Sequence, residues 1–205
     1  MALTEIQQFF DQFAAEWDYH FKPERRKRLH QIFARNLSFL KGPILDLGCG
    51  TGILLEVFKQ ELKRPPEQII ELDLSLNMLK QVCEGKGKFF PPCFPVQADG
   101  QHLPLKSNTM GSVVAFQVFP HFLQPEQVSK EILRVLKPNG YFAVLHLDDH
   151  QTLNTLHRSL HPIVQNHQLP PANILQKFFE QHGFLRIKSA EHKGLYFVLV
   201  QKPLY

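Results

Sequence analysis

Three glycines at alternate positions follow a short apolar run in residues 44–52, ILDLGCGTG. Glycines in this arrangement let a backbone loop approach a ligand closely. The loop lacks the Lys-Ser/Thr pair of a phosphate-binding loop, and Ile53 stands where a dinucleotide fingerprint needs its third glycine. Asp46 directly precedes the loop, where its carboxylate would repel a pyrophosphate. The pattern therefore favours a ligand with an amino group and a positive centre.

Apolar strands alternate with helices around this loop. Strands are predicted over residues 42–48, 68–74, 95–98, 110–119, 141–147, 184–192 and 195–202. Helices are predicted over residues 51–62, 75–85, 124–137 and 169–184. This alternation predicts an α/β fold with βαβ units and a mostly parallel sheet, and Lys193-Gly194 predicts an antiparallel hairpin at its C-terminal end. A loop rich in Gly and Pro is expected over 85–99, before and into the short third strand.

Residues 1–40 precede the first strand and are predicted to form an N-terminal helical lid. Apolar residues recur at helical spacing over 4–17, and a second helix is expected over 24–40. Residues 41–205 form the main domain, with an extra segment at about 148–170. Because this segment leaves the sheet at a strand's carboxyl end, we expect it near the ligand.

The composition is that of a globular protein, with 43% hydrophobic and 20% charged residues in a chain of 205. No apolar run approaches the ~20 residues of a membrane helix, and the start carries no basic and apolar leader. Three cysteines without a paired spacing predict reduced thiols, so we expect a cytoplasmic protein that is not inserted in a membrane. The net charge of +4 owes much to residues 22–30, KPERRKRLH, interpreted as a solvated helix face. Contact with an anionic substrate or nucleic acid is the alternative.

Five stretches in this order resemble the motifs of the class I S-adenosylmethionine (SAM) dependent methyltransferases. They are ILDLGCGTGIL, IIELDLSLNMLK, QADGQHLPL, SVVAFQVFPHF and EILRVLKPNGYFAVL, and they span roughly residues 42–147. The N-terminal stretch FFDQFAAEWD is similar to the lid helix of quinone-biosynthesis methyltransferases, which act on small molecules. The resemblance implies a Rossmann-like, seven-stranded, mostly parallel sheet with helices on both faces, and SAM as the cofactor. The chain departs from the family where Gly111-Ser112 replaces the usual Phe-Asp.

The resemblance implies that the glycine loop surrounds the methionine end of SAM. Asp46, Gly48 and Gly50 would form this loop, and Cys49 and Gly52 lie within it. Asp46 is expected to act partly through water on the amino group of the cofactor.

The resemblance also assigns the adenosine end of SAM. Asp73, at the end of the second strand, would accept hydrogen bonds from the ribose hydroxyls, as the acid of nucleotide-binding βαβ units does. Leu74 and Met78 would pack on the adenine. Asp99 would bind the adenine amino group, with the Gly100 N–H on a ring nitrogen.

The end of the fourth strand would face the reacting methyl group. There the resemblance places Phe116 and Gln117 under the methionine chain and the sulfonium. Methyl transfer needs an aligned nucleophile more than catalytic groups, and a general base matters only when the acceptor must lose a proton. His121 and His150 are the candidate catalytic bases. The Asn/Asp-Pro-Pro-aromatic signature of amino-methyltransferases is absent, which argues against exocyclic amines as acceptors.

The acceptor itself has three candidate contacts, Trp17, Tyr19 and His146. Five histidines lie between residues 146 and 167, and His157 and His161 have the i,i+4 spacing of one helix face. A metal site, a histidine-lined substrate pocket and a solvated helix remain open as interpretations, and we assign no metal ligand.

The sequence therefore predicts an enzyme that transfers a methyl group from SAM to a small-molecule acceptor. A methyltransferase acting on RNA or protein is one alternative, although binding of nucleic acid is disfavoured because the basic run is short. A SAM-binding module without catalysis is another. The pattern carries no prediction of the oligomeric state.

Overall fold

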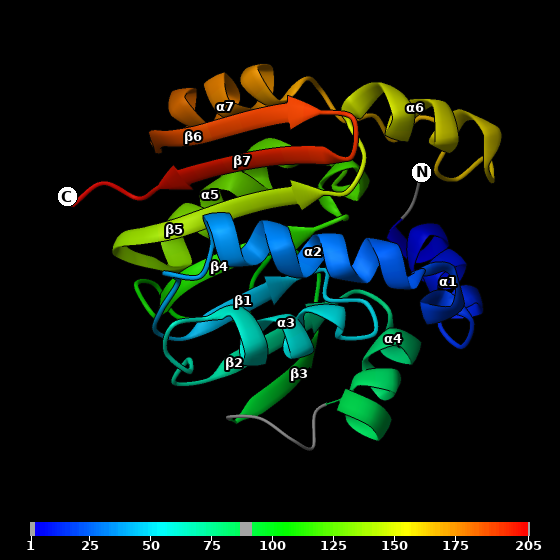
Figure 1. The fold of residues 1–205 in the computed structure, drawn as a ribbon, viewed down its shortest axis with the longest axis horizontal. Coiled ribbons are helices and arrows are strands. Elements are labelled where there is room, and N and C mark those ends of the chain that lie inside the picture. Colours follow the sequence, from blue (N-terminus) through cyan, green and yellow to red (C-terminus); the bar gives the residue numbers. More distant parts are fainter. Residues whose placement is uncertain (1–2, 87–91, 205) are drawn as a thin grey trace.

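The computed structural model describes residues 3–86 and 92–204, which form a seven-stranded sheet in the order β3-β2-β1-β4-β5-β7-β6 (Figure 1). The strands are β1 (Ile44–Leu47), β2 (Ile69–Asp73), β3 (Cys93–Gln97), β4 (Met110–Phe116), β5 (Leu136–His146), β6 (Leu185–His192) and β7 (Leu195–Gln201). The α-helices are α1 (Leu3–Phe13), α2 (Pro23–Asn36), α3 (Ile53–Glu61), α4 (Leu76–Gln81), α5 (Pro125–Val135), α6 (His150–Ser159) and α7 (Ala172–Gln181). Shorter helical turns are η1 (Trp17–His20), η2 (Val82–Lys86) and η3 (Phe119–His121).

The strand directions confirm the predicted fold class. Strands β1 to β5 run parallel to one another, whereas β7 is antiparallel to both β5 and β6. The turn between β6 and β7 lies at Lys193-Gly194, where Gly194 has a φ of +86° that favours glycine. The sheet is thus a parallel α/β sheet closed by the expected C-terminal hairpin.

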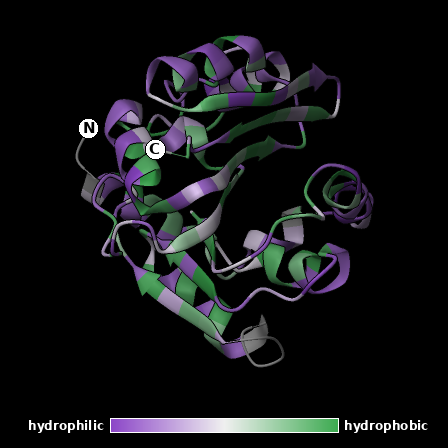
Figure 2. Ribbon diagram, turned by 90° about the vertical axis from the view of Figure 1, so that its left-hand side faces the viewer, coloured by the Kyte–Doolittle hydropathy of each residue, from purple (hydrophilic) through white to green (hydrophobic). Residues whose placement is uncertain are grey.

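Two apolar cores lie on opposite faces of the sheet, because successive side chains of a strand alternate between faces. In β4, Val113 and Ala115 belong to the core under α5 and α7, whereas Val114 and Phe116 belong to the core under α2 and α3. Figure 2 shows the strands as mostly hydrophobic and the outer helices as mixed. The helices therefore cover both faces, as predicted.

Helix α1 and the turn η1 lie at the carboxyl edge of the parallel strands, whereas α2 packs on one face of the sheet. Helix α2 contributes fully buried Leu29 and Phe33 to the core, and α1 packs beside α4 (Figure 1). The Asp11 carboxylate accepts hydrogen bonds from Ser75 Oγ at 2.5 Å and from the Asn77 N–H at 3.1 Å. Residues at the carboxyl ends of β1, β2 and β4 therefore have α1 and η1 above them.

The structure shifts several predicted boundaries. The first helix ends at Phe13 and is followed by the turn η1, and α2 ends at Asn36 rather than near residue 40. Strand β3 begins at Cys93, and residues 87–91 of the predicted loop lie outside the described residues. Packing explains why glycine stands at position 111, since a Cβ there would lie 2.4 Å from the Lys41 carbonyl oxygen. Within the described ranges, every helix is too short or too polar to span a membrane.

Candidate cofactor and acceptor site

The glycine loop lies against the ends of two neighbouring strands. Gly48, Gly50 and Gly52 all have positive φ, between +55° and +76°. The N–H groups of Gly48 and Cys49 donate to the Leu72 carbonyl at 2.8 and 3.0 Å. A Cβ on Gly48 would lie 2.3 Å from Val118 Cγ2, so only glycine fits there. The loop can therefore come close to a ligand through its backbone.

Asp73 lies at the end of β2 and holds this loop. Its carboxylate accepts the N–H groups of Gly50 and Ser75, both at 2.8 Å. Burial raises the pKa of Asp73 to about 6, and the negative charge of Asp11 adds to that rise, while the backbone hydrogen bonds lower it. The free lone pairs of an ionised Asp73 suit a pair of hydroxyl donors, as a ribose presents.

Asp46 lies beneath the loop in the middle of the sheet. Both of its carboxylate oxygens are buried, and neither has a hydrogen-bond partner among the described residues. Burial, and then the charge of Asp73, raises the pKa of Asp46 well above its usual value. Glu71, its register partner on β2, is also fully buried. A cationic amino group near the loop would offset this concentration of acid groups, so the site fits the methionine end of SAM.

The residues predicted to bind the adenine also lie together in the structure. Leu74, Met78, Asp99 and Gly100 line the same pocket as Asp73. Asp99 accepts hydrogen bonds from the main-chain and side-chain nitrogens of Gln101, both at 2.9 Å.

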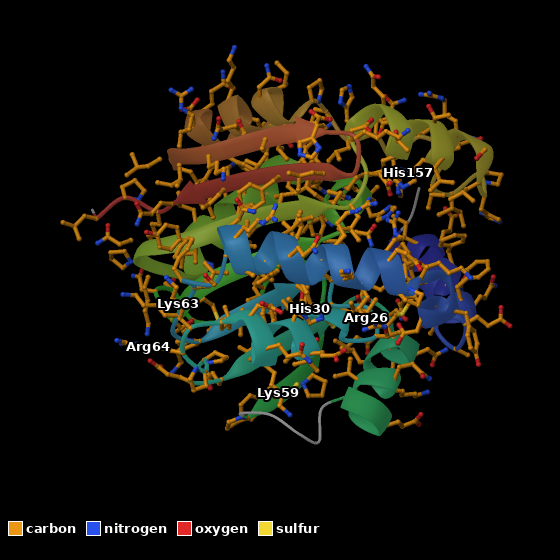
Figure 3. All side chains as sticks on the ribbon, viewed as in Figure 1. Arg26, His30, Lys59, Lys63, Arg64 and His157 are labelled. Atoms are coloured by element: carbon orange, nitrogen blue, oxygen red, sulfur yellow. The ribbon has the colours of Figure 1, made fainter. Side chains whose placement is uncertain are left out.

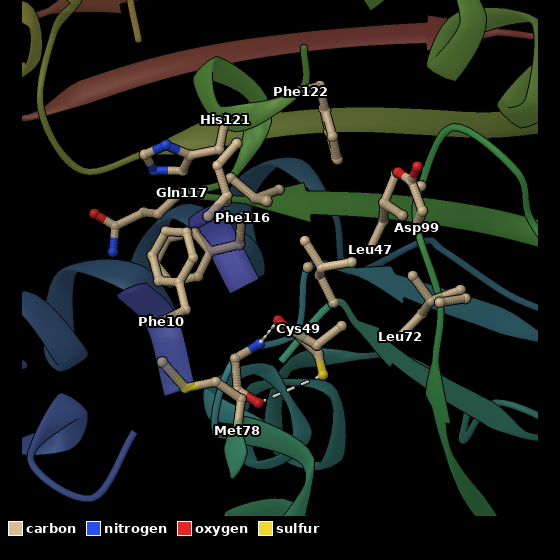
Figure 4. A pocket seen from close by; sticks show the side chains of 18 of the residues that line it. Phe10, Leu47, Cys49, Leu72, Met78, Asp99, Phe116, Gln117, His121 and Phe122 are labelled. Carbon is tan, nitrogen blue, oxygen red and sulfur yellow. Dashed lines mark hydrogen bonds between the residues drawn. The ribbon is translucent and has the colours of Figure 1, made fainter. Parts of the chain in front are cut away.

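One cavity of about 110 Å³ joins the residues predicted to bind the cofactor to an apolar wall (Figure 4). The wall comes from α1, η1 and the segment after β4, and its residues are Ile6, Phe10, Trp17, Val118, Phe122 and Leu123. Phe10 packs edge-on against both Trp17 and His121, with ring centroids 5.6 and 5.2 Å apart. No Lys or Arg lines this cavity in the part of the chain that the structure describes.

The end of β4 contributes Phe116, Gln117 and His121 to the cavity. Gln117 has a φ of +55°, uncommon for a residue with a side chain. Its Oε1 accepts a hydrogen bond of 3.1 Å from Arg25 Nη2, and the same nitrogen pairs with Asp148 at 2.8 Å. Helix α2 is thereby tied to the cavity wall and to the segment after β5.

The structure brings most of the predicted site residues together. The cavity contains Gly48, Cys49, Gly50, Asp73, Leu74, Met78, Asp99, Gly100, Phe116, Gln117, His121 and Trp17. Trp17 reaches the glycine loop, since its Nε1 lies 3.7 Å from the position of a Cβ on Gly50.

Five predicted site residues lie outside the cavity lining. Asp46 is beneath the loop, and Gly52 precedes α3 as its N-cap. Tyr19 is 77% exposed on η1. His146 is buried at the end of β5, with both ring nitrogens lacking a hydrogen-bond partner among the described residues. His150 begins α6 and contacts the Glu191 carboxylate through Nδ1.

The histidines of the extra segment do not share a solvated helix face. His157 is buried and points from α6 into the protein, whereas His161 lies beyond the end of α6 and packs against Phe9 at 5.2 Å between ring centroids. Across the residues that the structure describes, no group of three or more His, Cys, Asp or Glu side chains has an arrangement suited to a metal ion.

Two kinds of residue that belong to the site were not predicted from the sequence. Ile6 and Phe10 belong to an apolar helical stripe that a core contact would explain equally well, and Arg25 belongs to a basic run. The run is largely paired within the chain, because Arg26 contacts Glu56 at 3.3 Å and His30 contacts Glu61 at 2.8 Å. Figure 3 shows Arg26 and His30 between α2 and α3, with His157 near α6.

Known proteins resemble this chain in both sequence and fold. A family model described as a methyltransferase domain matches residues 45–144. A malonyl-[acyl-carrier protein] O-methyltransferase of Marinomonas sp. is 37% identical over 98 residues, 48% of this chain and 35% of that protein. A ubiquinone/menaquinone biosynthesis C-methyltransferase of Syntrophotalea carbinolica is 31% identical over 173 residues, 78% of this chain and 68% of that protein. The first of these relatives is therefore matched over only about a third of its length.

A solved structure shares the fold at low sequence identity. It comes from the complex of the Haloferax volcanii Trm112 methyltransferase activator with a methyltransferase, and it matches with a TM-score of 0.79. The identity is 16%, over 95% of this chain and 97% of that one. This likeness shows the shared fold. The methyltransferase domain model and the Syntrophotalea relative place the chain in the family of SAM-dependent methyltransferases, whose cofactor is S-adenosylmethionine.

Proposed function

We propose that the protein transfers a methyl group from SAM to a small, largely apolar acceptor bound beneath α1. The observation that carries the proposal is the continuous cavity from Asp73 and Asp99 to the aromatic wall of Phe10 and Trp17. SAM supplies a methyl group activated by a sulfonium, so this chain needs chiefly to hold the acceptor in line and exclude water. An apolar enclosure next to the cofactor loop suits that task.

The chain's own residues have separate roles toward the cofactor. Asp73 would accept the ribose hydroxyls, Asp99 and Gly100 would bind the adenine edge, and Leu74 and Met78 would pack on its faces. The negative charge of Asp46 would balance the positive charge of the SAM amino group, either through a bridging water or through the loop above Asp46. These roles are supported by the lining of one cavity and by the orphaned Asp46 carboxylate.

The acceptor is proposed to be uncharged. Lys and Arg are absent from the described cavity lining, and Arg25 is occupied by Asp148 and Gln117. A carboxylate would therefore lose its hydration without gaining a cationic partner. By name, one relative above is a malonyl-[acyl-carrier protein] O-methyltransferase and the other is a C-methyltransferase of ubiquinone/menaquinone biosynthesis. The apolar wall of this chain favours an acceptor suited to the second kind of enzyme.

Residues 1–40 are proposed to act as a lid. The Asp11 contacts with Ser75 and Asn77, and the Thr51 hydroxyl bond to Asp18 at 2.5 Å, hold α1 and η1 over the cavity. Trp17 would touch the acceptor or the methionine chain, whereas the exposed Tyr19 has no role in the cavity. Among the predicted bases, His121 is the one that lines the cavity; His150 is engaged with Glu191.

A methylation assay tests the proposal. The purified protein would be incubated with SAM and separate panels of neutral phenols and quinols, and of carboxylic acids, and S-adenosylhomocysteine would be measured by mass spectrometry. We expect turnover with the neutral aromatic panel and a loss of at least about tenfold in Phe10→Ala. Phe9→Ala is the matched control, since Phe9 lies outside this cavity. Turnover confined to carboxylic acids would contradict the neutral-acceptor proposal.

A further inference from the structure

Four histidines from separate elements meet beside the acceptor end of the cavity. His121 follows β4, His146 ends β5, His157 lies on α6, and His167 lies on the segment between α6 and α7. The ring of His121 has its centroid 5.0 Å from that of His167 and 5.2 Å from that of His157. Of these four, His121 lines the cavity, while the other three are buried behind it.

In this histidine cluster (His121, His146, His157 and His167), the surroundings favour the neutral form of His121, His146 and His167. Burial, and then the proximity of His167, His157 and His146, holds the pKa of His121 well below its usual value. Burial, and then His157, lowers the pKa of His146 to about 3, and the same two causes lower that of His167. Each of these three rings therefore carries one proton near pH 7, and its hydrogen bonds determine which nitrogen holds it.

The segment that carries His167 is fixed to α6. The His157 Nδ1–H donates to the His167 carbonyl oxygen, which can only accept. The Asn154 side chain makes two hydrogen bonds with Leu169. Its Nδ2 donates to the Leu169 carbonyl at 2.9 Å, and its Oδ1 accepts from the Leu169 N–H at 2.8 Å. The His167 N–H donates to the Val164 carbonyl at 2.9 Å. The His167 ring is thus held in place by α6 and by its own turn.

The contact between His121 and His167 joins two like atoms. Nδ1 of His121 and Nδ1 of His167 are 2.8 Å apart, so one must donate a proton and the other must accept it. If His121 donated, His167 would carry its proton on Nε2. That atom is buried and has no hydrogen-bond partner among the described residues. A buried N–H without a partner is rarer in proteins than an unpaired acceptor.

This comparison favours His167 as the donor. With its proton on Nδ1, His167 leaves only a lone pair at the buried Nε2. His121 then accepts this hydrogen bond at Nδ1, so its own proton must be on Nε2. Because Nδ1 of His121 is occupied by His167, Nε2 is the ring nitrogen that remains for a ligand in the cavity.

Resting on the proposed function, we propose that His167 is a positioning residue that fixes His121 as a neutral hydrogen-bond donor toward an oxygen of the acceptor. In this role His121 removes no proton from the acceptor. The acceptor class is narrowed accordingly to an uncharged, apolar molecule with a carbonyl or phenol oxygen near the methylated atom. The proton that such an acceptor loses on methylation passes to water and not to His121. Such an oxygen pairs with an imidazole N–H, whereas an amine hydrogen would need a bare ring nitrogen.

The tautomer can be measured without any acceptor. Long-range ¹H–¹⁵N spectra of protein labelled at histidine nitrogen distinguish protonated from unprotonated ring nitrogens, and His121 is assigned by loss of its signals in His121→Gln. In the wild type, at pH 7 and with S-adenosylhomocysteine as the bound probe, we expect His121 to be protonated at Nε2 and unprotonated at Nδ1. The opposite assignment overturns the proposal.

Two variants test whether residue 167 sets this state. His167→Asn keeps an N–H near the position of Nδ1, so His121 should stay protonated at Nε2. His167→Asp offers only an acceptor, so His121 should become protonated at Nδ1 and its pKa should rise. His192→Asn is a control at an exposed histidine and should leave His121 unchanged. An unchanged tautomer in a folded His167→Asp protein overturns the positioning role, and if that variant does not fold, loss of the Nε2 proton in His167→Asn does so.

Calorimetry on the same samples separates this inference from the proposed function. If SAM binds and His121 has the opposite tautomer, the inference falls while the methyltransferase proposal stands. If SAM does not bind, the proposed function itself fails, whatever the tautomer.

Discussion

Arg25 on α2 and Gln117 at the end of β4 meet through a hydrogen bond of 3.1 Å from Nη2 to Oε1. The two residues are far apart in the sequence, and the same guanidinium also pairs with Asp148 at 2.8 Å. The strained backbone of Gln117 is thus supported by a residue of the N-terminal region. This contact links α2 to the cavity wall at Gln117.

The first prediction concerns Arg25→Ala. We expect the dissociation constant of SAM to rise by roughly tenfold, because the Gln117 side chain loses its partner, which corresponds to about 1.4 kcal/mol. The free energy of unfolding should fall by less than about 1 kcal/mol, since the Arg25–Asp148 pair is partly exposed. Calorimetry and urea unfolding measure the two effects. Arg26→Ala is the matched control, because its partner Glu56 lies away from the cavity; equal effects of both variants on SAM binding would refute a special role for Arg25.

The second prediction concerns Gly48. Gly48→Ala should abolish measurable SAM binding and lower the free energy of unfolding by about 1–3 kcal/mol, because the new Cβ meets Val118 and the backbone has positive φ. Gly183→Ala is the control, since Gly183 has a φ of +91° and its nearest contact is Leu133 at 3.3 Å. That variant should lose stability but keep SAM affinity. Normal SAM binding by Gly48→Ala would show that the loop tolerates a side chain at its closest approach.

The third prediction is a pH dependence of cofactor binding. Ribose hydroxyls donate to an ionised carboxylate, and the pKa of Asp73 is raised to about 6. SAM affinity should therefore be constant above about pH 7 and fall by about tenfold per pH unit below pH 6, as Asp73 becomes protonated. Calorimetric titrations with S-adenosylhomocysteine between pH 5 and 8 measure this dependence. Affinity that increases on acidification would contradict the role of an ionised Asp73.

The fourth prediction concerns stability in acid. His146 is neutral when buried, with a pKa lowered to about 3, whereas it titrates near 6.5 in an unfolded chain. The unfolded state therefore binds the extra proton first, and stability is lost as the pH falls below about 6.5, by at most about 1.4 kcal/mol per pH unit from this one group. Thermal unfolding between pH 7 and 5 should be less acid-sensitive in His146→Leu than in the wild type. His102→Leu is the control, because the His102 side chain is 77% exposed, and an equal change in both variants would contradict the assignment to His146.

The sequence was sufficient to predict the sheet, the hairpin and most of the residues that gather around the cavity, because those features depend on local patterns. Three patterns can be interpreted from the local sequence alone, without knowledge of long-range contacts. They are the glycines of 48–52, the acidic residues at strand ends, and the alternation of apolar runs. Val118 and Leu123 could not be assigned in this way, because ordinary apolar residues acquire a role only through their place in the fold.

The histidines illustrate the limit more sharply. The i,i+4 spacing of His157 and His161 suggested a shared helix face, but α6 ends at Ser159 and the two rings separate. His121 and His167, by contrast, meet across a long stretch of chain that no periodicity connects. Long-range pairing of this kind depends on how α6 and the following turn pack, which local spacing does not encode.

The most direct test of the account is the calorimetric titration of SAM and S-adenosylhomocysteine into the wild type and Asp73→Ala. The account predicts a dissociation constant on the order of micromolar in the wild type, equivalent to about 8 kcal/mol of binding free energy, and a loss of at least about 100-fold in the variant. Glu56→Ala, at an acid outside the cavity lining whose partner is Arg26, should lose far less. Absence of binding by the folded wild type, or equal affinity in Asp73→Ala, would contradict the cofactor site on which the proposed methyl transfer depends.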